Sequence, residues 1–262
     1  MENRQLIVIR ISRNSLSFST RVEGVVTFEP YALNSSISMA ANLREALHKG
    51  TWYKGDGSQK AQVMIDTPVL MMPVDLFREE EMELMYQNTF SKQDQQTVMH
   101  YVLPDLNSVA IFSIHKDLCN VLRDAFKEVT FIPAIAPVWR HLHQRSYTGQ
   151  HQKLYVYFHE RQMEVFAFAQ NRFKYCNSFV ANNPNDALYY MLAVWKQLSM
   201  VPERDELYLA GDLPEQDILT EEAKKFVKRV FYINPSGEFN RAAVTQIAGM
   251  PYDLMTLFVK GR

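Results

Sequence analysis

The sequence predicts an α/β protein with mixed sheets, built from two similar domains. The main observation is an internal repeat, because two stretches about 150 residues apart each show a β-hairpin, a third short strand and an amphipathic helix. The hairpins are predicted over residues 6–20 and 154–169, where apolar strands flank short polar turns. A polar stretch at 144–152, which contains Gly149, separates the repeats. We therefore expect one domain at 1–145 and a second at 146–262.

Composition narrows the class of protein. The 262 residues are 47% apolar and 22% charged, which is ordinary for a globular protein able to bury a substantial core. A net charge of −1 argues against a nucleic-acid partner, which usually demands a basic face. No apolar run approaches the ~20 residues that span a bilayer, and the N-terminus lacks a signal-peptide pattern, so no membrane insertion is expected. Cys119 and Cys176 lack metal-ligand spacing, which favours core positions and a reduced, cytoplasmic setting.

Local signals then predict the elements of the first half. Glu23-Gly24 makes a tight turn into a third strand that Pro30 is expected to stop. Ser36 is the predicted N-cap of the first helix, and Asp117 of a later one. The segment 55–58 has no second acidic ligand nearby, so it is interpreted as a loop tip and not as a metal or phosphate site. The remaining predicted elements are strands at 63–65, 69–72, 97–103, 109–114 and 129–132, and helices at 78–87 and from Pro137 to His143.

The second half repeats this plan. After the hairpin, a turn at Gln170-Asn171 leads into a third strand at 172–176. Asn183-Pro184 with Asp186 is a strong helix start. The elements predicted after that helix are a strand at 206–210 that ends at Gly211-Asp212, a helix at 215–228, a strand at 230–233, a turn at 234–237 and a C-terminal helix.

The paired histidines His141 and His143 are not interpreted as a metal site. Residues two apart on a helix point in different directions, so the two rings cannot hold one ion together. No cysteine or carboxylate lies at ligand spacing beside them.

This order of elements resembles the actin-like ATPase fold, which actin, Hsp70 chaperones, sugar kinases and bacterial pilus and secretion assembly proteins share. That fold has two similar ribonuclease H-like domains, each opening with a β-hairpin and a third strand before its helices. The sequence also resembles a bacterial family whose fold is described as actin-like. The likeness covers nearly the whole chain by its pattern of elements, and much less of it by motif.

The resemblance implies a nucleotide site with three motifs. The first hairpin of the fold normally has Asp-x-Gly, where this chain has Arg10 and Ser12. The second normally has an aspartate and a glycine-rich turn, but residues 157–162 contain neither. The adenosine motif, a strand followed by two glycines, is half present as Gly211-Asp212. The candidate residues for an anion or nucleotide in the implied cleft are therefore Arg10, Ser12, Arg13, Asn14, Glu160, Arg161, Gly211 and Asp212.

These differences argue against conventional ATP hydrolysis. A phosphate-cradling turn needs residues with positive φ or without Cβ, and neither hairpin turn contains glycine. Arginine repels magnesium and accepts no hydrogen bond, so it cannot replace the aspartate. No catalytic residue, metal site or cofactor is predicted, and ATP with magnesium stays the alternative. Arg10 is expected either to pair internally with Glu160, Glu164 or Asp212, or to grip an anion directly.

Three functions from different classes follow. The first is a catalytically silent, actin-like scaffold that binds another protein, or a further copy of itself. The second is a nucleotide-binding protein or slow ATPase that uses non-standard ligands. The third is a small-molecule or sugar kinase, which lacks an evident catalytic base here.

Overall fold

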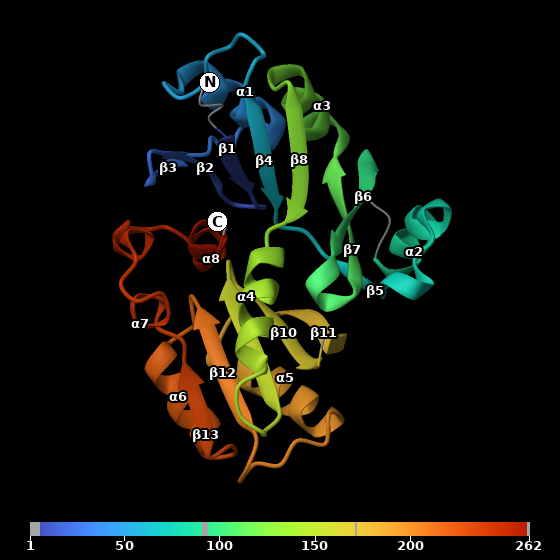
Figure 1. Cartoon of the computed structure of the whole chain (residues 1–262), viewed down its shortest axis with the longest axis vertical. Helices are drawn as coiled ribbons and strands as arrows, with labels where there is room; N and C mark the ends of the chain where they lie inside the picture. Colours follow the sequence, from blue (N-terminus) through green and yellow to red (C-terminus); the bar gives the residue numbers. More distant parts are fainter. Residues whose placement is uncertain (1–5, 91–93, 171, 261–262) are drawn as a thin grey trace. The chain divides into compact units, whose positions relative to one another are not determined.

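A computed structural model describes residues 6–90, 94–170 and 172–260 and divides them between two compact units. The first unit comprises Met1–Leu103 and Ser108–Ala136, and the second comprises Pro104–Asn107 and Pro137–Arg262 (Figure 1). This division lies at the start of helix α4 (Ala136–Ser146), whereas the sequence placed the boundary at its end. The short segment Pro104–Asn107 joins the second unit because Asp105 accepts hydrogen bonds from Arg140 of α4.

The first unit opens with the predicted antiparallel meander. It consists of β1 (Leu6–Ile11), β2 (Leu16–Val22) and β3 (Val25–Tyr31). Two parallel strands extend it on the side of β1, namely β4 (Lys60–Ile65) and then β8 (Glu128–Pro133). The strand order of the sheet is β3-β2-β1-β4-β8. Pro30 was expected to stop the third strand but lies inside it, opposite Ser17. Since β3 is an edge strand, a residue without an N–H group is tolerated there.

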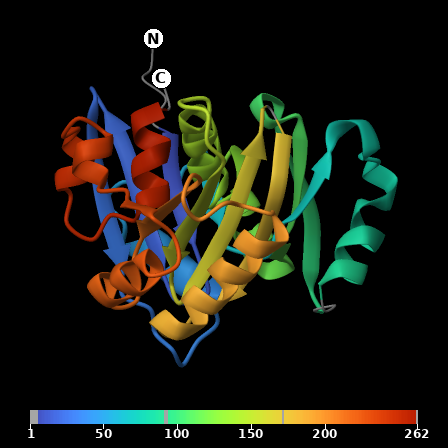
Figure 2. The same cartoon turned by 90° about the horizontal axis from the view of Figure 1, so that it is seen from below.

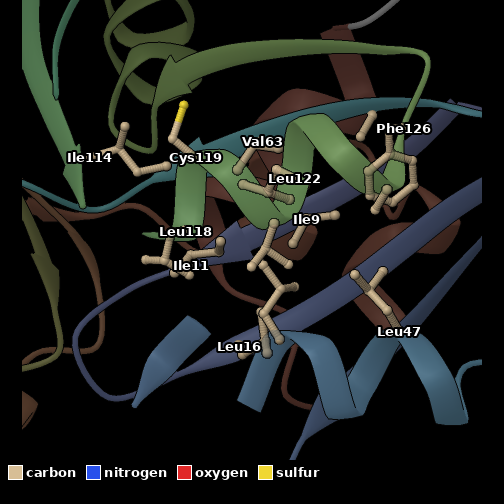
Figure 3. Close-up of a cluster of buried hydrophobic side chains, with 14 of the residues drawn as sticks. Ile9, Ile11, Leu16, Leu47, Val63, Ile114, Leu118, Cys119, Leu122 and Phe126 are labelled. Carbon is tan, nitrogen blue, oxygen red and sulfur yellow. The ribbon is translucent and has the colours of Figure 1, made fainter. Parts of the chain in front are cut away.

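Helices α1 (Met39–Lys49) and α3 (Lys116–Ala125) pack against this sheet. Figure 3 shows their side chains meeting those of the strands in the buried core. Cys119 is part of this core, as predicted. The core side chains drawn and labelled there are Ile9, Ile11, Leu16, Leu47, Val63, Ile114, Leu118, Cys119, Leu122 and Phe126.

Two helix caps differ from the prediction. The Ser38 hydroxyl, and not Ser36, accepts the backbone N–H of Ala41 at 3.2 Å. Similarly, the ring of His115, and not Asp117, caps α3 by accepting the N–H of Asp117 at 3.2 Å.

A three-stranded sheet completes the first unit. Its strands are β5 (Leu70–Pro73), β6 (Gln96–Leu103) and β7 (Ser108–His115), in the order β5-β7-β6. The predicted hairpin of β6 and β7 is confirmed. Between β5 and β6, the helix expected at 78–87 consists of a 3-10 turn, Glu79–Glu81, followed by α2 (Met82–Thr89). Two further 3-10 turns are Val74–Leu76 and Pro104–Leu106.

The second unit repeats the topology of the first sheet. It contains β9 (Lys153–His159), β10 (Gln162–Ala169), β11 (Arg172–Val180), β12 (Glu206–Gly211) and β13 (Arg229–Tyr232) in the order β11-β10-β9-β12-β13. Both sheets thus begin with a hairpin and a third strand and continue with two parallel strands, which confirms the predicted repeat. Asn171, in the predicted turn before β11, lies outside the described residues.

Helices cover both faces of this second sheet. The helix α5 (Pro184–Gln197) begins at the Asn183 cap as predicted and lies against β10 and β11 (Figure 2). With α6 (Gln216–Lys224) it buries one face, while α4 contributes to the other. The helix expected at 215–228 ends early, at Lys224, and the turn expected at 234–237 is a short helix, α7 (Pro235–Glu238). The chain continues through a 3-10 turn, Ala243–Gln246, to α8 (Tyr252–Lys260).

Candidate functional site

The turn between β1 and β2 is organised around the hydroxyl group of Ser12. Its oxygen accepts the backbone N–H of Ser15 at 2.9 Å and that of Asn14 at 3.3 Å. The Ser12 N–H in turn donates to the Ser15 carbonyl at 2.9 Å. Backbone N–H groups of a turn are the donors that hold a phosphate when they converge on it. Here two of them point to a side chain of the turn itself.

Arg10 lies at the base of this turn. Its side chain is 2% exposed, and its guanidinium donates a hydrogen bond to the Ser15 hydroxyl at 3.0 Å. Arg13 and Asn14 are exposed at the tip. The turn therefore brings together Arg10, Ser12 and the backbone of Asn14, whereas the predicted pairing of Arg10 with a carboxylate stays a prediction.

The turn between β9 and β10 adopts a left-handed backbone without glycine. Glu160 has φ 45° and Arg161 has φ 65°. Two-residue hairpin loops with positive φ at both positions strongly prefer Asn-Gly, because a Cβ atom is strained there. A phosphate-cradling turn was expected to need positive φ or residues without Cβ, and this turn has positive φ at two residues although it contains no glycine.

Replacing Arg161 with glycine should stabilise the protein. The exposed Arg161 is strained in its left-handed backbone conformation, and glycine would relieve this strain. Glycine also increases the conformational entropy of the unfolded chain, which opposes part of the gain. We expect a net gain of about 0.5 kcal/mol in the free energy of unfolding, measured by urea denaturation. Arg161→Ala is the control, since alanine removes the side chain but keeps the strain, and an equal gain for both variants would contradict the backbone explanation.

Gly211 and Asp212 lie where β12 ends beside the end of β9. Gly211 is opposite Phe158, and the Asp212 N–H donates to the Phe158 carbonyl at 2.9 Å. Gly211 has φ +87°, and a Cβ atom there would lie 2.1 Å from the Phe158 carbonyl oxygen. The exposed Asp212 side chain adds to burial in raising the pKa of Tyr232. The fold itself therefore requires this glycine.

The candidate residues thus form two groups, one in each unit. Arg10, Ser12, Arg13 and Asn14 belong to the β1–β2 turn of the first unit. The other four, Glu160, Arg161, Gly211 and Asp212, lie at the adjoining ends of β9, β10 and β12 in the second unit. Within the described ranges, no group of histidine, cysteine and carboxylate side chains could hold a metal ion.

The second unit contains a buried ionic cluster that was not predicted from the sequence. Glu238 of α7 contacts two side chains of α4: its carboxylate is 2.8 Å from the His141 ring nitrogen Nε2 and forms an ion pair with Arg145. The Arg145 guanidinium also lies over the Tyr208 ring, 5.0 Å from its centre. His143 instead faces the Gln170 carbonyl, at 2.8 Å, so the two histidines do point in different directions. The available signal was the spacing of His141 and Arg145, which are four apart on one helix face.

Known proteins resemble this chain both in sequence and in fold. The family model described as "Protein of unknown function (DUF3822)" matches residues 2–230. The chain belongs to the DUF3822 family. No curated protein matches it.

Two solved structures place this DUF3822 protein in a known fold. The first is a protein of Bacteroides thetaiotaomicron with an actin-like ATPase fold and unknown function, with 29% identity, a TM-score of 0.80, and coverage of 93% of this chain and 96% of that one. The second is from the PilM–PilN type IV pilus biogenesis complex, with 11% identity, a TM-score of 0.58, and 97% of each chain covered. The predicted actin-like ATPase fold with two domains is confirmed. Among the described helices, none has the length and apolar character needed to cross a membrane.

Proposed function

We propose that this DUF3822 protein is a catalytically silent, actin-like scaffold that binds another protein. The observation that carries the proposal is the closed β1–β2 turn. By the resemblance, this turn corresponds to a phosphate loop, and an incoming phosphate would have to compete with the Ser12 hydroxyl for the N–H groups of Asn14 and Ser15. Because Ser12 is 5% exposed and its hydroxyl belongs to a hydrogen-bonded network, displacing the hydroxyl would leave buried polar groups without partners.

Electrostatics at the same turn supports the proposal. A nucleotide reaches most ATPases with magnesium, which takes hard oxygen ligands from carboxylates, phosphates and water. The buried Arg10 occupies the position where the resemblance implies a carboxylate. A fixed positive charge there raises the free energy of a bound dication, so magnesium-dependent phosphoryl transfer is disfavoured.

The protein partner is proposed from the kind of complex in which a fold relative was solved. The pilus relative comes from a complex with a second protein, PilN. A scaffold needs the fold's two domains and surface but no phosphate chemistry, which fits the closed turn. We propose a reduced, cytoplasmic setting as well, since Cys119 and Cys176 are both free and burial raises the pKa of each thiol.

Magnesium-ATP should leave the thermal stability of the protein unchanged. A ligand present at a hundred times its Kd would add ~2.7 kcal/mol to the free energy of unfolding, a shift that differential scanning fluorimetry detects readily. Magnesium chloride alone and magnesium-GTP serve as controls for ionic and general nucleotide effects. A magnesium-dependent stabilisation by ATP would contradict the proposal.

The second candidate function, a nucleotide- or anion-binding protein with non-standard ligands, is favoured by the buried guanidinium of Arg10. The same experiment separates it from the scaffold. Stabilisation by ATP that persists in EDTA and is lost in Arg10→Ala would favour this second candidate.

A further inference from the structure

A polar pocket in the second unit lies apart from both groups of candidate residues. Its volume is about 290 Å³, and it is formed where α4, β9, β10 and β11 come together with the connection between α4 and β9. The described residues that line it include no aspartate or glutamate. The lining side chains that matter below are those of His151, Gln152, Lys153, Phe168 and Lys174.

Two ammonium groups make the pocket positive. Lys153 is 7% exposed and donates to the Arg145 carbonyl at 3.1 Å and to the carbonyl and hydroxyl oxygens of Thr148, the latter at 3.0 Å. Lys174 donates to the side-chain oxygen of Gln152. These acceptors are all uncharged, so neither ammonium group donates one of these hydrogen bonds to a carboxylate.

The nearby carboxylate of Glu206 is engaged elsewhere. Burial lowers the pKa of Lys153, and the charge of Glu206 only partly offsets this effect. The Glu206 oxygens accept the Tyr208 hydroxyl at 2.9 Å and pair with Arg229 at 3.4 Å. A buried positive charge with neutral partners is a favourable place for an external anion, because the Coulomb term is stronger away from bulk water.

The pocket adjoins an open sheet edge. Among the described strands β11 pairs only with β10, so one row of its backbone N–H and C=O groups faces outward. The other edges of the two five-stranded sheets are better protected: β3 contains Glu29 and Pro30, β8 contains Glu128 and Pro133, and β13 has only 4 residues. By contrast, residues 175–180 of β11 contain neither proline nor a charged side chain.

Lys174 connects these two features, since it belongs to β11 and also lines the pocket. We propose that an extended acidic segment of a partner protein adds as a strand to β11 and places one carboxylate in this pocket. Backbone hydrogen bonds to the edge give such a complex its affinity, and the pocket at its end selects the side chain. This inference rests on the proposed function in naming the partner's chemistry, but its test does not involve nucleotide.

The probe is a blocked peptide of alternating glutamate and valine, compared with the same peptide in which glutamine replaces glutamate. We expect the glutamate peptide to bind at least tenfold more tightly by fluorescence anisotropy, which corresponds to about 1.4 kcal/mol. Lys174→Gln should weaken its binding about tenfold, whereas Lys196→Gln, an exposed lysine on α5, should leave it unchanged. Hydrogen exchange at the backbone N–H groups of β11 should slow in the complex.

Five results would overturn the inference. Equal binding of the two peptides would show that the pocket does not select a carboxylate. Equal weakening by Lys174→Gln and Lys196→Gln would show that binding depends only on general charge attraction. Binding without protection of β11, or complete displacement by equimolar inorganic phosphate, would show a small-anion site with no added strand. Absence of peptide binding together with absence of a magnesium-ATP effect would leave the silent fold intact while refuting this partner.

Discussion

Replacing Gly211 with valine should prevent the second unit from folding stably. A Cβ atom at this position would lie 2.1 Å from the Phe158 carbonyl oxygen and 2.8 Å from the Tyr157 ring, so backbone would have to move. In addition, φ +87° is strongly unfavourable for a β-branched residue. We expect a loss of at least about 4 kcal/mol in the free energy of unfolding, a large part of the stability of a typical domain. Urea denaturation followed by circular dichroism measures it.

Gly149 provides the matched control for this substitution. It has φ +76° and also belongs to the second unit, but a Cβ atom there would have nothing within 4 Å. Gly149→Val therefore carries the conformational strain alone, which we expect to cost about 1–2 kcal/mol. Equal losses in the two variants would contradict the steric explanation. A much larger loss for Gly211→Val would show that this glycine is needed whether or not a nucleotide ever binds beside it.

Gly211 illustrates how far a motif can be interpreted without a structure. From the sequence it looks like half of an adenosine-binding pair, and it does lie at the end of a strand, as the last residue of β12. The close approach of the Phe158 carbonyl is a purely structural reason for glycine at this position. That contact becomes visible only when β9 and β12 are seen to pair. A glycine that a ligand would need and a glycine that the fold needs look identical in one sequence.

The fold itself was predictable because its strongest signals are local. Both hairpins combine alternating apolar residues with short polar turns, so their strands and order follow from neighbouring residues. Errors arose where tertiary structure decides. Pro30 is acceptable only because β3 is at an edge, and Ser38 is the cap because Asn42 fixes the preceding loop by accepting the Asn34 N–H at 2.8 Å. Neither the edge nor the loop is visible in the sequence.

The candidate site was predictable in position but not in arrangement. Arg10 and Ser12 were identified from their place in the hairpin, yet the role of the Ser12 hydroxyl depends on the conformation of a four-residue turn. The ionic cluster was missed for a different reason. Glu238 pairs with His141 and Arg145 across more than ninety positions, and it directly follows the segment predicted as a turn. Non-local pairs of this kind leave no periodic pattern.

Replacing Glu238 with alanine should destabilise the second unit by about 3 kcal/mol, because removing one partner of a largely buried ion pair leaves the charge of Arg145 uncompensated and the buried His141 ring without its hydrogen-bond partner. Its side chain is 13% exposed, and its partners His141 and Arg145 are 8% and 34% exposed. Glu221→Ala is the control, since that carboxylate pairs with Lys224 on the surface of α6 and such pairs contribute at most ~1 kcal/mol. Equal effects of the two substitutions in urea denaturation would contradict a buried network.

The same cluster should make stability depend on acid pH. The hydrogen bond from His141 lowers the pKa of Glu238, and the charge of Arg145 adds to it against the opposing effect of burial. Because the folded pKa lies below the unfolded value of ~4.3, the stabilisation is complete above that value and is lost as the pH falls through the folded pKa. Wild-type stability should therefore decline below about pH 4.5, and Glu238→Gln should flatten part of that decline. Asp205 should account for part of the pH dependence that remains in this variant. Burial raises the pKa of Asp205, but hydrogen bonds from Arg204 and from two backbone N–H groups outweigh that effect and lower it. An unchanged acid profile in Glu238→Gln, measured by urea denaturation at each pH, would contradict this prediction, because it would mean that Glu238 titrates alike in the folded and unfolded chain despite its contacts with His141 and Arg145.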